Sequence, residues 1–90
     1  MLFRSVAELV SDARAAGAWR EVGYAPHVGD LVVLKRANGD PRVGGTGHVA
    51  RVESCADGVL VTIDGNHSDR VERVTRSLSD PELVGWIAYP

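Results

Sequence analysis

Several features that mark specialised proteins are scarce or missing in this sequence. Cys55 is the only cysteine among 90 residues, so the chain cannot form an internal disulfide, and its redox compartment stays open. No apolar run approaches the roughly 18 residues of a membrane span, and no long apolar segment follows the N-terminus as in a signal peptide. The formal charge of −2 and the pI near 5.8 indicate no surface for nucleic acid or for an anionic membrane.

What remains is the composition of a small globular domain. Hydrophobic residues make up 44% of the chain and charged residues 24%, which are ordinary values for a folded domain. Ninety residues are enough for one domain with one modest core. We therefore predict a single domain over residues 1–90. Nothing in the sequence indicates a cofactor, and the cellular location is not determined by it.

The first predicted element is a helix over residues 5–17. Ser5 and Glu8 have the spacing of a capping box, and Gly17 is placed to end the helix. Between them, apolar residues recur at helical spacing: Val6, Leu9, Val10, Ala13 and Ala16.

Five later segments have the pattern of β-strands separated by polar or glycine-rich turns. They are residues 31–34, 48–53, 59–63, 70–75 and 83–89. Residues 55–58 are predicted to form the hairpin turn between the second and third of these strands. One helix followed by consecutive strands predicts an α+β fold, in which the helix packs on a curved antiparallel sheet of about five strands over residues 30–89.

A glycine-rich turn, residues 44–47, leads directly to His48 at the start of a predicted strand. Alternation places His48 on the small, apolar face of that strand, which we expect the helix to cover. The polar turn at residues 64–69 follows the next strand and falls at the same end of the sheet if the two strands form a hairpin. Asn66 or Asp64 would then lie beside His48. An imidazole beside an amide or carboxylate supplies two of the three groups of a thiol hydrolase site.

Four motifs occur in a fixed order: Gly-Asp-Leu-Val at 29–32, Gly-His-Val at 47–49, Gly-Asn-His-Ser-Asp at 65–69 and Val-Gly-Trp-Ile at 84–87. This order resembles the C-terminal two-thirds of CHAP domains, the cysteine, histidine-dependent amidohydrolases/peptidases. CHAP domains belong with the NlpC/P60 families in the papain-like superfamily and cut peptide or amide bonds in bacterial cell walls. The resemblance implies half of a papain-like fold and a peptidoglycan peptide as substrate, with no nucleic-acid or membrane partner.

The resemblance also assigns roles to individual residues. It places the catalytic histidine at His48 and the residue that orients its ring at Asn66, with Asp64 as the second choice. The family's nucleophilic cysteine lies upstream of the predicted helix, where this sequence has none. Cys55 does not replace it, because six residues of strand separate it from His48 by roughly 20 Å.

Three expectations follow from the missing segment. The 90 residues are a truncated domain without activity of their own, and residues 1–5 are a non-native leader. The chain self-associates through the sheet face that the lost helix leaves uncovered.

Simpler interpretations exist for the same residues. His48 could be a core histidine, and Asn66 could serve only its turn, since Asn tolerates left-handed backbone. A metal site is a further alternative, but its candidate ligands lack the short spacing of zinc ligands: His27, His48, His67, Asp64 and Cys55.

A non-catalytic function is the main alternative to a hydrolase. The short antiparallel strands also suit a small SH3-like barrel that binds a peptide or cell-wall glycan. In that case the ligand would be held by three aromatic residues: Trp19, Tyr24 and Trp86. Such aromatic side chains more often cover the core than bind a ligand.

Overall fold

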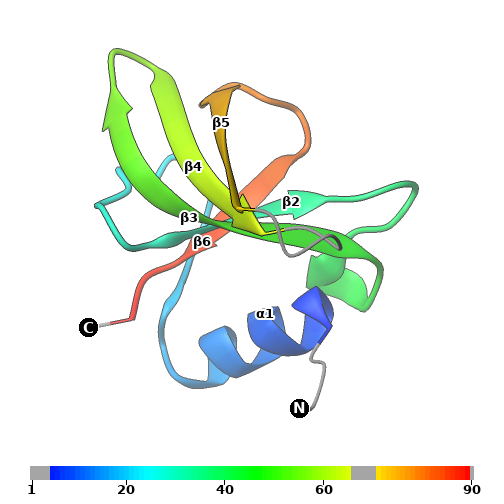
Figure 1. The fold of residues 1–90 in the computed structure, drawn as a ribbon. Helices are drawn as coiled ribbons and strands as arrows, with labels where there is room; N and C mark the ends of the chain where they lie inside the picture. The colour runs from blue at the N-terminus through cyan, green and yellow to red at the C-terminus, as the bar shows by residue number, and fades with distance from the viewer. Residues whose placement is uncertain (1–4, 66–70, 90) are drawn as a thin grey trace.

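One helix lies against a strongly curved antiparallel sheet in the computed structural model, which describes residues 5–65 and 71–89 (Figure 1). The elements are α1 (Val6–Ala15), β1 (Trp19–Arg20), β2 (Leu31–Lys35), the short 3-10 helix η1 (Pro41–Val43), β3 (Gly47–Ala56), β4 (Val59–Gly65), β5 (Val71–Ser77) and β6 (Leu83–Ile87). The strand order is β1-β6-β2-β3-β4-β5, and every pairing is antiparallel. The predicted α+β class is confirmed.

The sheet has six strands in the described part of the chain, where the sequence predicted about five. The additional strand is β1, whose two residues pair with the end of β6. A strand of two residues has no alternating pattern, so the sequence gives no signal for it. The other five strands lie within a few residues of their predicted positions.

Helix α1 begins and ends with the capping interactions that its sequence indicates. The Ser5 hydroxyl accepts a hydrogen bond from the backbone N–H of Glu8 at 3.1 Å. At the other end, Gly17 has φ +71° and the Ala18 N–H donates to the carbonyl of Ala13, as in a Schellman motif. The helix is therefore fixed by local interactions at both ends as well as by packing.

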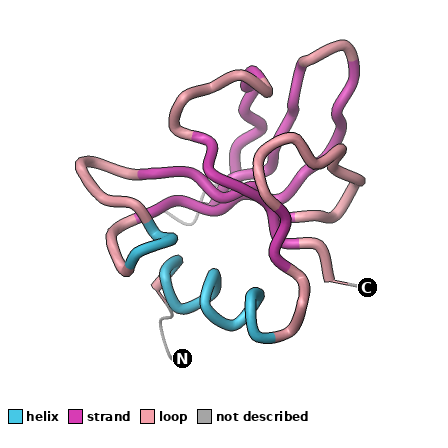
Figure 2. The backbone as a smooth tube through the Cα atoms, turned by 180° about the vertical axis from the view of Figure 1, so that it is seen from behind, coloured by secondary structure: helices cyan, strands magenta, loops and turns pink. Residues whose placement is uncertain are grey.

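Two apolar clusters lie on opposite faces of the sheet. The helix-side cluster lies between the sheet and α1 and contains Val10, Ala13, Ala18, Val33, Val84 and Ile87. The other lies on the face of the sheet turned away from α1, which we call the inner face. This inner-face cluster contains Val32, Leu34, Ala50, Val52, Leu60, Leu83 and Trp86. Figure 2 shows α1 and η1 together on one side of the strands. Strands β2 and β6 consequently carry buried apolar residues on both faces.

The prediction that the helix covers the face carrying His48 is wrong. His48 alternates with Ala50 and Val52, which belong to the inner-face cluster, whereas Val49 packs toward α1. Helix α1 packs mainly on Val33, Val84 and Ile87 of the neighbouring strands β2 and β6, so the alternation within β3 could not indicate which face the helix would take. His48 therefore lies on the opposite side of the sheet from α1.

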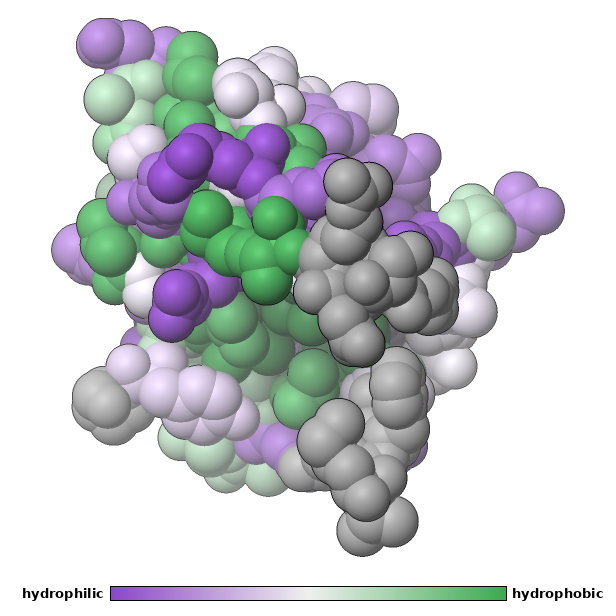
Figure 3. All heavy atoms as spheres, in the orientation of Figure 1, coloured by the Kyte–Doolittle hydropathy of each residue, from purple (hydrophilic) through white to green (hydrophobic). Residues whose placement is uncertain are grey.

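On the side of the molecule drawn in Figure 3, hydrophobic atoms are visible in a band between the sheet and α1. Several partly buried apolar side chains pack at the edge of the helix-side cluster, among them Val6, Leu9 and Val49. The predicted self-association depends on apolar surface of this kind and stays a prediction.

Candidate active site

His48 is the second residue of β3, directly after the glycine-rich turn. A side chain on Gly47 would place its Cβ 2.6 Å from Pro41 Cγ and 3.0 Å from the carbonyl oxygen of Leu34. The close approach of η1 and β2 therefore requires glycine immediately before the histidine. The turn holds His48 at the beginning of its strand, with its side chain on the inner face.

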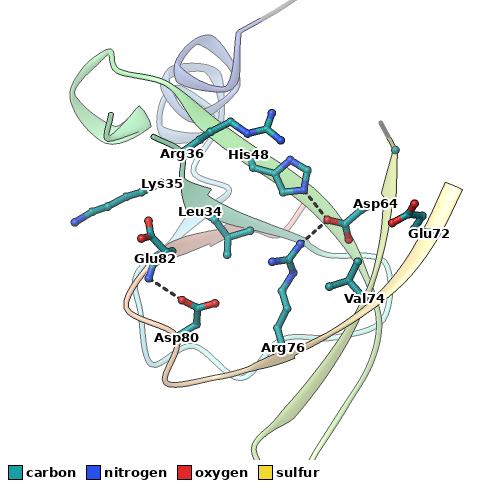
Figure 4. Close-up of a pocket in the computed structure, with 11 residues that line it drawn as sticks. Leu34, Lys35, Arg36, His48, Asp64, Glu72, Val74, Arg76, Asp80 and Glu82 are labelled. Carbon is teal, nitrogen blue, oxygen red and sulfur yellow. Dashed lines mark hydrogen bonds and ion pairs between the residues drawn. The ribbon is translucent and has the colours of Figure 1, made fainter. Parts of the chain in front are cut away.

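Asp64 lies near the end of the neighbouring strand β4 and is hydrogen-bonded to His48. Nε2 of His48 is 2.6 Å from Oδ2 of Asp64 (Figure 4). The side chain of His48 is 20% exposed and that of Asp64 10% exposed, so the pair is largely shielded from solvent. Alternation along β4 places Asp64 on the inner face together with the buried residues Leu60 and Thr62.

Two further side chains hold the Asp64 carboxylate. The buried Thr62 hydroxyl donates to Oδ1 at 2.5 Å, and Nη2 of Arg76 donates to Oδ2, the oxygen that also contacts His48. Nε of Arg76 donates to the Thr62 hydroxyl at 3.2 Å. Both carboxylate oxygens thus accept hydrogen bonds, as a buried charged group requires.

The pKa of Asp64 lies below its ordinary value because favourable contacts outweigh burial. Burial is the largest influence and by itself raises the pKa of the Asp64 carboxyl. Hydrogen bonds from Thr62 and His48, together with the charge and hydrogen bond of Arg76, lower the pKa by more than burial raises it. Asp64 is therefore ionised at neutral pH.

The pair opens into a cavity of about 370 Å³ on the inner face. Its lining is mainly polar and charged: Lys35, Arg36, His48, Asp64, Glu72, Arg76, Asp80 and Glu82, with Leu34, Gly65 and Val74 between them. The charged groups come from strands on both sides of His48, so the cavity suits a polar ligand more than an apolar one.

Of the three residues singled out from the sequence, the structure brings His48 and Asp64 together. Asn66, the partner of His48 preferred from the sequence, lies outside the described residues, as do His67 and the first four residues of the leader predicted over residues 1–5. The choice between Asn66 and Asp64 as the residue that orients the ring stays a prediction.

Thr62 and Arg76 were missed by the sequence analysis. A signal for both exists in the strand pattern, because an acidic residue on an apolar strand face needs a nearby donor or cation. In the observed register, Arg76 of β5 lies opposite Leu60, on the inner face. Its long side chain then reaches along the sheet to Asp64, which no spacing rule in the sequence specifies.

Cys55 lies far from this site. It is in strand β3, where it is paired with Leu60, and not in the hairpin turn as predicted, because the turn consists of Asp57 and Gly58 alone. It packs against the inner-face cluster, seven residues along the strand from His48, a separation of roughly 20 Å. Cys55 cannot act together with His48.

The three aromatic residues of the alternative binding function do not form one surface. Trp19 packs with the helix-side cluster, whereas Trp86 is 1% exposed in the inner-face cluster on the other side of the sheet. Tyr24 lies near Trp86, with ring centroids 6.4 Å apart, and its hydroxyl donates to Asp30. These residues cover the core, as aromatic side chains usually do.

Within residues 5–65 and 71–89, no three His, Cys, Asp or Glu side chains converge as metal ligands would. His27 lies on an exposed turn with its side chain 80% accessible, in contact with Tyr24 and Asp30. In the same part of the chain, no helix is both long and apolar enough to cross a membrane.

The fold and the site define an α+β domain with a histidine–carboxylate pair in an open cavity of the sheet. The family model of the CHAP domain matches residues 4–66, more than half of the chain, and the chain therefore belongs to the CHAP domain family. The matched segment includes α1, His48 and Asp64. A comparison with curated proteins found no match.

Proposed function

We propose that this domain is part of a cysteine- and histidine-dependent peptidoglycan amidase or endopeptidase. In this proposal His48 is the general base and Asp64 orients its ring. The observation that carries the proposal is the hydrogen bond between His48 Nε2 and Asp64 Oδ2 within a polar cavity, in a chain of the CHAP family.

The protonation states follow from the charge of Asp64. An ionised carboxylate can only accept hydrogen bonds, so Nε2 of the neutral His48 ring must carry the proton. Nδ1 then holds the free lone pair, and no described residue makes a hydrogen bond to it. That nitrogen is available to accept a proton from a thiol, as the base of a catalytic triad does.

The reaction proceeds through a covalent acyl-enzyme. Nδ1 of His48 takes the proton from a cysteine thiol as the sulfur attacks the carbonyl carbon of the amide. The C–N bond breaks, and the leaving amine receives this proton from the imidazolium. Water, deprotonated by the same ring, then hydrolyses the thioester and regenerates the thiol. Asp64 stabilises the imidazolium that forms in each step.

The nucleophile in this proposal is a cysteine other than Cys55, which is the only cysteine in the chain. In the family that the sequence resembles, that cysteine lies upstream of the helix corresponding to α1. The 90-residue chain alone is therefore expected to have no hydrolase activity. A segment that supplies a thiol beside His48 Nδ1 should be both required and sufficient for hydrolase activity.

The test is to fuse an upstream CHAP segment carrying the cysteine to this chain and to measure release of new amino groups from purified peptidoglycan. We expect activity from the fusion and from its Cys55→Ser variant. His48→Ala should lose at least about 100-fold in rate, the usual contribution of a general base. A folded fusion without activity, or full activity in the His48→Ala variant, would contradict the proposal.

A further inference from the structure

We propose that Arg76 is a positioning residue of this site, which fixes the Asp64 carboxylate against His48 and offsets its charge. The inference rests on the function proposed for His48 and Asp64 and goes beyond it. Arg76 lies outside residues 4–66, the segment that matches the family model, so the match gives it no role.

The hydrogen bonds of Arg76 connect it to both oxygens of the Asp64 carboxylate. The Arg76 side chain is 17% exposed and extends along the inner face from its position opposite Leu60. Its Nε donates to Thr62, and its Nη2 donates to Asp64 Oδ2 (Figure 4). Thr62 in turn donates to Asp64 Oδ1. Arg76 therefore holds the carboxylate directly through one oxygen and indirectly, through Thr62, at the other.

This arrangement limits rotation of the carboxylate group. Turning the Asp64 carboxylate about its terminal bond would break the hydrogen bond of Arg76, Thr62 or His48. The planar guanidinium suits this task because its donors have a fixed geometry, whereas a lysine ammonium would act as a single point charge. The 2.6 Å contact with His48 is thereby kept in one orientation.

The positive charge of Arg76 also acts on His48 through Asp64. The cation of Arg76 and the ring of His48 share one oxygen of Asp64, and the guanidinium stays charged at every relevant pH. Protonation of His48 adds a second positive charge beside it. Without Arg76, the shielded Asp64 carboxylate would favour the imidazolium of His48 more strongly. Arg76 thus helps the ring to stay neutral, as a general base must be near neutral pH.

Other charged side chains also face this cavity. Lys35 and Arg36 come from the end of β2, Glu72 from β5, and Asp80 and Glu82 from the segment that leads into β6. Arg36, Glu72 and Glu82 are exposed to solvent, where salt and water screen their influence. Arg76 is mostly buried and is hydrogen-bonded to Asp64, so its effect on His48 should exceed theirs.

Strand β5 also provides a matched control for Arg76. Arg73 carries the same charge on the same strand but points to the other face, where it pairs with Glu53 at 2.7 Å. Its side chain is 66% exposed. Arg73→Gln therefore makes the same change of charge without touching the His48–Asp64 pair.

The experiment is an NMR titration of His48 in the 90-residue chain, with Arg76→Gln, Arg76→Lys, Arg73→Gln and Asp64→Asn variants. We expect Arg76→Gln to move the midpoint of the His48 titration upward, because the cation that offsets the Asp64 carboxylate is lost. Arg76→Lys should move it in the same direction by less, and Arg73→Gln should leave it unchanged. A purely structural role for Arg76 predicts lower stability with an unchanged midpoint, and that result would overturn the inference.

The Asp64→Asn variant separates this inference from the proposed function. If Asp64→Asn leaves the His48 midpoint unchanged, the two residues do not interact in solution and the proposed function loses its support. If Asp64→Asn moves the midpoint and Arg76→Gln does not, only the inference about Arg76 is wrong. Should Arg76→Gln fail to fold, the Asp64 carboxyl is titrated in the Arg76→Lys variant and in the wild type. The same titration curve in both proteins would refute the positioning role of Arg76.

Discussion

Replacing Asp64 with asparagine should destabilise the domain strongly, because the substitution removes the counter-charge of a largely buried arginine. The Asp64 carboxylate accepts hydrogen bonds from Thr62, His48 and Arg76, and the whole residue, backbone included, is 7% exposed. Breaking a buried ion pair by removing one partner costs about 3–5 kcal/mol. Since the Arg76 side chain retains 17% exposure, we expect the lower end of that range, about 3 kcal/mol.

The measurement is urea denaturation of the wild type, the two single variants Asp64→Asn and Arg76→Gln, and the double variant. If the two side chains act as a pair, the double variant should be more stable than the sum of the single effects implies. Glu53→Gln is the control, because its partner Arg73 is exposed and exposed pairs contribute little. Additive effects, or a loss under about 1 kcal/mol in Asp64→Asn, would refute the reasoning.

Three other predictions concern pH, backbone packing and association. The lowered pKa of Asp64, whose ordinary value is 3.8, gives a stabilisation that is complete above that value and is lost as pH falls through the folded-state pKa. The stability difference between wild type and Asp64→Asn, followed by urea denaturation, should therefore shrink in acid, and a constant difference would contradict this. Gly47→Ala should lower the free energy of unfolding by about 1–3 kcal/mol, because the added Cβ would meet Pro41. Gly65→Ala should be tolerated, because a Cβ at that position meets no atom within 4 Å. Sedimentation velocity should show a dimer fraction that grows with protein concentration, and a monomer throughout would argue against an uncovered apolar face.

Most of the fold could be predicted from the sequence because its elements have strong local signals. The capping residue Ser5 and the terminal Gly17 bound the helix, and the strands alternate or are continuously apolar. Strand β3 was predicted too short, since the register shifts at Glu53, where a bulge changes the alternation. The choice of face for α1 could not be predicted, because residues such as Val33 and Leu34 are buried on opposite faces of the same strand.

The candidate site could be predicted in part. The glycine-rich turn and the strand pattern place His48 and Asp64 at one end of the sheet. Arg76 was not foreseen, because its side chain contacts Asp64, which lies four residues along β4 from Leu60, the residue opposite Arg76. Thr62 was missed for a related reason, since a threonine in a strand is unremarkable until a carboxylate lies next to it.

The most direct test of the account compares Asp64→Asn and Asn66→Ala in a protein that carries the catalytic cysteine, by the rate of peptidoglycan hydrolysis. We predict that Asp64→Asn lowers kcat by about 100-fold or more with little change in KM, because the His48 ring loses its anionic partner. Full activity of the Asp64→Asn enzyme, with the loss appearing in Asn66→Ala instead, would contradict it.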